Sequence, residues 1–182
     1  MPEFSRPATL KIIYVNLACA LLIVGLAAVS LVRRAHSLDE VIVRVSREHG
    51  MDPRLVSAVI WKESRFDRTA QGKAGEIGLM QVMPETAMEW AGSRGLAGFT
   101  PEHLFDPETN LQAGVWYLRK ALDEWSTKDN PLPYALAQYN AGRRNVLKWD
   151  EAVKSDEARF LQNIPFPGTA RYVRDIITRY RM

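Results

Sequence analysis

The stretch that decides the fold is DPRLVSAVIWKE, at residues 52–63. An aspartate followed by a proline is typical of a helix N-terminus, because the carboxylate caps free N–H groups and the proline fits the first turn. Apolar residues then recur at the helical period, at Leu55, Val56, Val59 and Ile60. The same period places Glu63 on the buried-facing stripe, in the last turn of the helix.

Similar start signals recur along the rest of the chain. Thr100-Pro101 and Asp106-Pro107 repeat the cap-proline pattern, and Ser37 with Glu40 forms a capping box for a helix that Gly50 ends. The long helix after Asp106 carries an apolar stripe at Leu111, Val115, Leu118, Leu122 and Trp125.

Two further helices are predicted near the C-terminus. One runs from Pro133 through Asn140, and the other is capped by Thr169. The stripe of the last helix comprises Tyr172, Val173, Ile176, Ile177 and Tyr180. The glycine-rich segment 71–78 reads as a loop or a small hairpin. The sequence therefore predicts an all-α domain with little or no β-sheet.

The N-terminal region differs in composition from the rest. Residues 12–32 form 21 positions without a charge, flanked by Lys11 and by Arg33-Arg34. A helix of this length would span a bilayer's hydrocarbon core. We expect an N-terminal flank at 1–11, a transmembrane anchor at 12–32, a short linker at 33–37 and one domain at 38–182. A cleaved signal peptide is the alternative for 12–32, because Ala28-Val29-Ser30 resembles a cleavage site.

The charge distribution argues against a nucleic-acid-binding protein. Four of the 24 basic and one of the 21 acidic residues lie in 1–37, which leaves 20 of each in the rest of the chain. The domain is therefore balanced in charge, and it carries no motif typical of nucleic-acid-binding proteins. The single cysteine, Cys19, allows no disulfide within the chain and no thiolate metal site.

A carboxylate on the buried stripe is a candidate acid catalyst. Burial of Glu63 would disfavour its charged form, and the negative end of the helix dipole would act in the same direction. A carboxylic acid that stays protonated near neutral pH can protonate the leaving oxygen of a glycosidic bond. The alternative is a frayed helix end, with Glu63 in solvent and paired with Arg65 or Lys62.

Three motifs in order carry a resemblance to a known family. They are ESRF at 63–66, GLMQVMP at 78–84 and AQYNAG at 137–142. They resemble the signature blocks of the soluble lytic transglycosylases, whose fold is similar to that of goose-type lysozyme. The segment from Asp106 to Leu118 also resembles the central helix of this family. The resemblance covers about residues 38–180.

The resemblance implies roles for particular residues. Glu63 matches the catalytic acid of the family, and Gly78 matches a glycine that lets the backbone approach the sugar. The implied substrate-binding residues are Ser64, Gly78, Met80, Gln81, Met83, Tyr139, Asn140 and Tyr172. Structural roles remain open for several of them: Tyr139 could be a core residue, Asn140 a helix cap, and Met80 and Met83 gap-fillers. The chain departs from the family pattern at Gly72, where many relatives have Ser, and at Gly168, where Glu is frequent.

The implied reaction is cleavage of the bond between N-acetylmuramic acid and N-acetylglucosamine in peptidoglycan, with a 1,6-anhydro ring as the product. It uses one carboxyl group as acid and then as base, with no metal and no cofactor. The alternatives are hydrolysis by a muramidase, in which Asp67 or Glu76 would position a water, and a non-catalytic peptidoglycan-binding protein. The substrate implies a single-pass protein of the cytoplasmic membrane with its domain in the periplasm. Envelope-spanning secretion or pilus machinery is a candidate partner.

Overall fold

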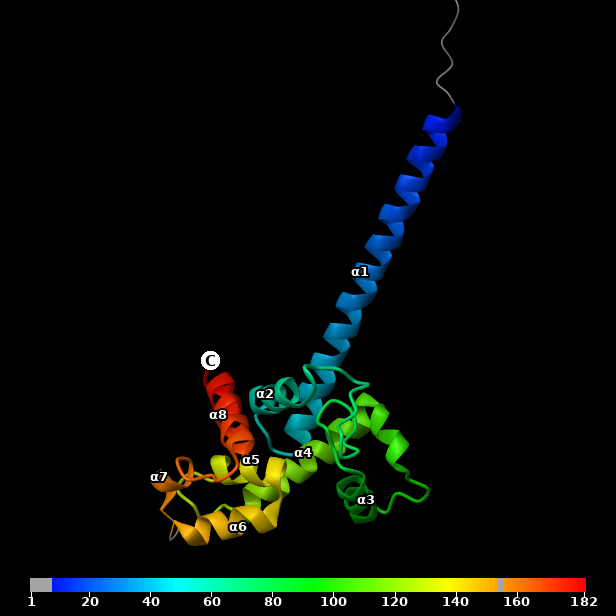
Figure 1. The fold of residues 1–182 in the computed structure, drawn as a ribbon. Coiled ribbons are helices and arrows are strands. Elements are labelled where there is room, and N and C mark those ends of the chain that lie inside the picture. The colour runs from blue at the N-terminus through cyan, green and yellow to red at the C-terminus, as the bar shows by residue number, and fades with distance from the viewer. Residues whose placement is uncertain (1–7, 154–155) are drawn as a thin grey trace, which may run out of the picture. The chain divides into compact units, whose positions relative to one another are not determined.

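A computed structural model describes residues 8–153 and 156–182, without side chains at positions 8–12, 15, 18, 26–37, 157 and 158. The chain divides into two compact units, Met1–Glu40 and Val41–Met182. Its elements in order are α1 (Ala8–Glu48), α2 (Pro53–Ser64), α3 (Pro84–Ser93), the 3₁₀ helix η1 (Pro101–Phe105), α4 (Pro107–Glu124), α5 (Leu132–Ala141), α6 (Arg143–Ala152), α7 (Glu157–Phe160) and α8 (Pro167–Arg181) (Figure 1).

The second unit is helical, as the sequence predicts. Helix α5 packs against α4, α6 and α8, and α2 lies along α8 (Figure 1). In the part of the chain that the structure describes, β pairing is limited to isolated bridges that join Ile77 to Gln71 and to Val82. The predicted loop or hairpin at 71–78 is therefore an irregular loop with two bridges.

Several predicted helix starts are confirmed. Asp52 caps α2 by accepting a hydrogen bond from the backbone N–H of Arg54, and Asp106 caps α4 through that of Thr109. In α4 the apolar stripe faces the core: Leu111, Val115 and Leu118 are fully enclosed, and Leu122 is partly exposed.

Two predicted starts differ from the structure. Thr169 does not cap the last helix, because α8 begins two residues earlier, at Pro167, whose fixed φ suits a first helical turn. Helix α1 runs without interruption through 33–37, where the sequence predicts a linker and a new helix at Ser37. This segment contains no proline or glycine, so nothing in it breaks a helix that has already formed.

Part of the predicted membrane anchor at 12–32 lies outside the side chains that the structure describes. Among the residues that the structure does describe, no helix is both long enough and apolar enough to span a bilayer.

Alanine substitutions at two helical glycines, one packed against the loop that follows α2 and one in open space, test how closely α4 approaches this loop. A Cβ at Gly114, in α4, would lie 2.7 Å from Sδ of Met80 and 2.8 Å from its Cβ, whereas a Cβ at Gly92, in α3, would meet nothing within 4 Å. We expect Gly114→Ala to lower the free energy of unfolding by about 1–3 kcal/mol through overpacking. Gly92→Ala should raise it by about 0.5–1 kcal/mol, because alanine favours the helix. Chemical denaturation of the full-length protein in detergent measures both. Equal effects of the two variants would contradict the close approach of α4 to Met80.

Candidate active site

Glu63 lies in the last turn of α2, on the side that faces α8. The hydroxyl of Tyr172, in α8, donates a hydrogen bond to Oε1 of Glu63 over 2.5 Å. The neighbouring Lys62 makes an ion pair of 2.6 Å with Asp175, one turn further along α8. Glu63 is therefore part of a packed helix pair, and the frayed-end alternative is excluded.

The environment of Glu63 raises its pKa to about 7. The largest cause is loss of hydration on burial, and the negative charge of Glu76 acts in the same direction. The hydrogen bond from Tyr172 and the positive charge of Lys62 oppose the shift, because both favour the carboxylate. Desolvation prevails, so the pKa of Glu63 lies near neutral pH.

Two tyrosines lie near this carboxyl group, Tyr172 buried and Tyr139 half-buried. Burial and the charge of Glu63 raise the pKa of both Tyr139 and Tyr172 well above the ordinary value, so both phenols stay neutral donors at physiological pH. The hydroxyl of Tyr139 donates to the backbone carbonyl of Met80 over 2.9 Å, and its ring lies 5.5 Å from that of Tyr117. Tyr139 thus joins α5 to the loop that carries the second motif.

The loop at 77–82 is held by side chains that bind its backbone. The buried amide of Asn110, in α4, accepts a hydrogen bond from the N–H of Met80 and donates to the carbonyls of Ile77 and Leu104. Ser64 donates to the carbonyl of Leu79 over 2.7 Å. Asn110 appears in the sequence only within the central-helix resemblance. Its role was missed there because a buried asparagine gives no periodic signal.

The structure assigns several expected sugar-binding residues to the support of this loop. Met80 is fully buried, with its side chain against Gly114, and Ser64 is 9% exposed with its hydroxyl engaged. Gly78 has a positive φ of 75°, and a Cβ there would lie 2.3 Å from Nδ2 of Asn110. Gly78 therefore makes room for Asn110. Its expected approach to a sugar stays a prediction.

The other expected residues lie closer to the surface. Gln81 is partly exposed and adopts a φ of 46°, and its amide donates to the carbonyls of Ala70 and Gly78. Met83 is partly exposed just before α3. Asn140 is exposed near the end of α5 and accepts a hydrogen bond of 2.7 Å from Thr169, while Gly142 is the residue that caps that helix.

The two candidate second acids differ in their surroundings. Asp67 accepts hydrogen bonds from both the N–H and the hydroxyl of Thr69, each 2.8 Å long, and these bonds lower its pKa. Asp67 is thus occupied in a local turn. Glu76 is the acidic residue whose charge acts on Glu63.

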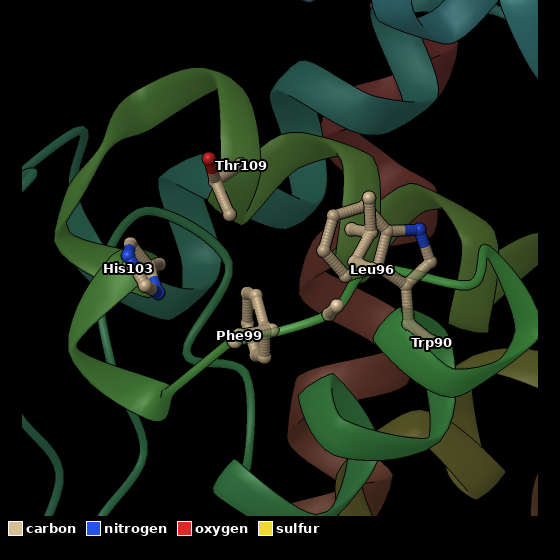
Figure 2. Close-up of a pocket in the computed structure, with 7 residues that line it drawn as sticks. Trp90, Leu96, Phe99, His103 and Thr109 are labelled. Carbon is tan, nitrogen blue, oxygen red and sulfur yellow. The ribbon is translucent and has the colours of Figure 1, made fainter.

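A separate pocket of about 270 Å³ lies beside the end of α3 (Figure 2). Its lining consists of Trp90, Leu96, Ala97, Gly98, Phe99, His103 and Thr109. None of the expected site residues contributes to it, so it is distinct from the surroundings of Glu63.

Comparison with known families identifies the one to which this chain is similar. Residues 40–161 match the transglycosylase SLT domain. The chain belongs to this family. Tyr172, which contacts Glu63, lies beyond the matched residues.

Sequence relatives carry matching names. The chain is 32% identical over 123 residues to the soluble lytic murein transglycosylase of Escherichia coli K12, an alignment that covers 66% of this chain and 19% of the relative. It is 37% identical over 117 residues to membrane-bound lytic murein transglycosylase F of Desulfosudis oleivorans, covering 63% and 24%. The chain thus spans about a fifth to a quarter of the length of these relatives.

Solved structures agree with this assignment. The lytic transglycosylase Slt of Pseudomonas aeruginosa, in an inactive mutant, superposes with a TM-score of 0.69 at 27% identity, covering 78% of this chain and 23% of that one. A 70-kDa soluble lytic transglycosylase in complex with bulgecin A gives a TM-score of 0.70 at 27% identity, with the same coverage. The fold is therefore the helical, lysozyme-like fold that the motifs implied.

The raised pKa of Glu63 makes stability depend on pH. The folded protein holds this proton more tightly than the unfolded chain, in which the pKa is near 4.5. The free energy of unfolding therefore falls as the pH rises from about 4.5 to about 7, because Glu63 ionises less readily in the folded protein. Glutamine does not titrate. The free energy of unfolding of Glu63→Gln should therefore rise by about 1–3 kcal/mol relative to that of the wild type between pH 4.5 and 7, since a pKa difference of one corresponds to about 1.4 kcal/mol.

Denaturant unfolding of the full-length protein at pH 4.5, 6 and 8 measures this difference. Glu85→Gln, an exposed change in the first turn of α3, serves as the control and should show no comparable trend. A constant difference between Glu63→Gln and wild type at all three values would show that Glu63 has an ordinary pKa.

Proposed function

We propose that this chain is a peptidoglycan lytic transglycosylase with Glu63 as its acid and base. The observation that carries the proposal is the half-buried carboxyl group of Glu63, which ends α2 and accepts a hydrogen bond from Tyr172 of α8 in a member of the SLT family. Loss of hydration there raises its pKa to about 7. A group that acts first as acid and then as base works best with a pKa near the operating pH.

In the first step Glu63 donates its proton to the oxygen that joins N-acetylmuramic acid to N-acetylglucosamine. The bond from this oxygen to C1 of the muramoyl sugar breaks, and the electron pair stays on the leaving oxygen. The N-acetyl group of the substrate stabilises the positive charge that develops at C1. Tyr172 holds the carboxyl group in place and stabilises the carboxylate that remains.

In the second step the Glu63 carboxylate removes the proton from the muramoyl 6-hydroxyl, and O6 bonds to C1. The 1,6-anhydro ring closes, and Glu63 is protonated again, now by the proton of the 6-hydroxyl, while the proton from the first step stays on the leaving sugar's hydroxyl. No water is consumed, so one carboxyl group is sufficient. A hydrolase would need a second carboxylate to position water.

Digestion of purified peptidoglycan by the full-length protein tests the reaction, with product masses measured by liquid chromatography and mass spectrometry. We expect muropeptides with anhydro ends, lighter by one water than hydrolysis products. Glu63→Gln should lower the rate at least about 100-fold, because general acid catalysis commonly contributes 10²–10⁴-fold. Glu85→Gln should retain wild-type activity.

Two outcomes would contradict the proposal. Reducing ends in place of anhydro ends would identify a muramidase. A folded protein that binds peptidoglycan without releasing products would identify a binding protein.

We also propose that residues 12–32 anchor the chain in the cytoplasmic membrane, with residues 38–182 in the periplasm. The support is the 21-residue uncharged run and the periplasmic location of the proposed substrate. Two basic residues flank the run on each side, so charge does not fix the orientation. The anchor would confine cutting to glycan near the membrane.

Membrane fractionation tests the anchor. The full-length protein should stay in the membrane pellet after extraction with alkaline carbonate, and a chain without residues 1–37 should be released. Release of both forms, or loss of residues 1–30 from the mature protein by mass spectrometry, would favour the cleaved signal peptide.

A further inference from the structure

The last helix of the chain, α8, has two sides of different character. One side packs into the core, where Tyr172 and Ile176 are buried. The solvent side carries exposed arginines at helical spacing, namely Arg171, Arg174 and Arg181. Within the described part of the chain, none of these three arginines forms an ion pair. The solvent side of α8 is therefore a stripe of uncompensated positive charge.

Two further arginines flank this stripe on the side of α2. The guanidinium carbons of Arg65 and Arg179 lie 3.4 and 4.3 Å from the ring centroid of Trp61, which is half-buried. Stacking on an indole fixes the orientation of a guanidinium group and leaves its N–H edge open to an anion. With the stripe they make up the basic face, which consists of Arg65, Arg171, Arg174, Arg179 and Arg181.

The charge of the domain is unevenly distributed. Residues 38–182 contain 20 basic and 20 acidic residues, so their formal charges cancel. Helix α8 nevertheless has four arginines against Asp175, and Lys62 pairs with that aspartate over 2.6 Å. Acidic residues are concentrated instead in the segment 84–108, at Glu85, Glu89, Glu102, Asp106 and Glu108. Helices α4 and α5 lie between α3 and α8, so the domain has a basic side and an acidic side (Figure 1).

We propose that the basic face docks this domain on a bilayer that contains anionic phospholipids. Guanidinium groups bind phosphate through paired N–H groups, and the attraction to an anionic surface acts within about 10 Å. Trp61 suits this place, because indole rings are enriched where lipid headgroups meet water. The proposal rests on the membrane anchor proposed above, which would keep the domain within reach of the bilayer.

Docking through α8 has a consequence for the acid. The same helix carries Tyr172, whose hydroxyl binds Glu63 over 2.5 Å. A membrane contact that fixes α8 therefore also fixes the orientation of Glu63 relative to the membrane, and the acidic side around α3 faces away from the lipid.

Fluorescence of the full-length protein in nanodiscs tests the docking, with a dye on one cysteine and a nitroxide on lipid headgroups as the quencher. Cys19→Ser removes the native thiol, and Thr178→Cys places the dye at an exposed position between Arg174 and Arg181. We expect stronger quenching in discs that contain phosphatidylglycerol than in discs of phosphatidylcholine alone. Gly92→Cys is the matched control on α3, where a Cβ meets nothing within 4 Å, and its dye should show no such difference.

Charge variants show whether the arginines cause the contact. Arg171→Gln, Arg174→Gln and Arg181→Gln together should abolish the extra quenching at position 178. Each basic residue near an anionic surface changes the ratio of docked to free domain about fivefold. Lysine at the same three positions keeps the charge and should retain the quenching. Salt at about 1 M should abolish it, because the screening length falls to about 3 Å. Circular dichroism checks that every variant is folded.

The outcomes separate the basic face from the anchor. Equal quenching at position 178 in both kinds of disc, or in the glutamine and lysine variants, would overturn the docking. A dye at 178 that responds to soluble peptidoglycan fragments but not to phosphatidylglycerol would also overturn it and assign the basic face to the wall polymer.

A chain that does not insert into nanodiscs would overturn the anchor, and sedimentation with phosphatidylglycerol vesicles then tests the basic face alone. Sedimentation that the three glutamine changes abolish would support the docking, and a chain that stays in the supernatant would overturn it.

Discussion

The site depends on one kind of interaction, the hydrogen bond from a helix side chain to the backbone of the loop at 77–82. This loop has almost no regular structure of its own, so its N–H and carbonyl groups need partners from elsewhere. Ser64 from α2, Asn110 from α4 and Tyr139 from α5 supply them. Gly78 is required because a side chain there would collide with the amide of Asn110. The loop is therefore ordered before any ligand arrives.

The pKa of Glu63 results from effects that act in opposite directions. Burial and the charge of Glu76 favour the protonated acid, whereas Tyr172 and Lys62 favour the carboxylate. Burial acting alone would raise the pKa of Glu63 further, and the contacts with Tyr172 and Lys62 acting alone would lower it. The balance lies at about 7, where both protonation states are populated near neutral pH.

The sequence predicted what depends on periodicity and local caps. The helix at Pro53–Ser64, its cap at Asp52 and the direction of the pKa shift of Glu63 all follow from the pattern at 52–63. The sequence could not distinguish residues that line a site from residues that hold it. Ser64, Gly78 and Met80 stand inside the motif, but their contacts are to the loop and to α4. Those contacts join positions 15 to 59 residues apart, and no local pattern encodes them.

The clamps on the loop bind backbone N–H and carbonyl groups rather than side chains. Asn110 binds one amide N–H and two carbonyls, and Ser64 and Tyr139 each bind one carbonyl. The geometry of the loop thus depends little on the side chains it displays at its surface, except for Gln81, whose amide binds the carbonyls of Ala70 and Gly78. Mutations at the displayed positions can accumulate without loss of the framework, whereas the clamping residues tolerate little change. Such a division lets natural variation or protein engineering alter what the loop recognises while the acid behind it stays in place.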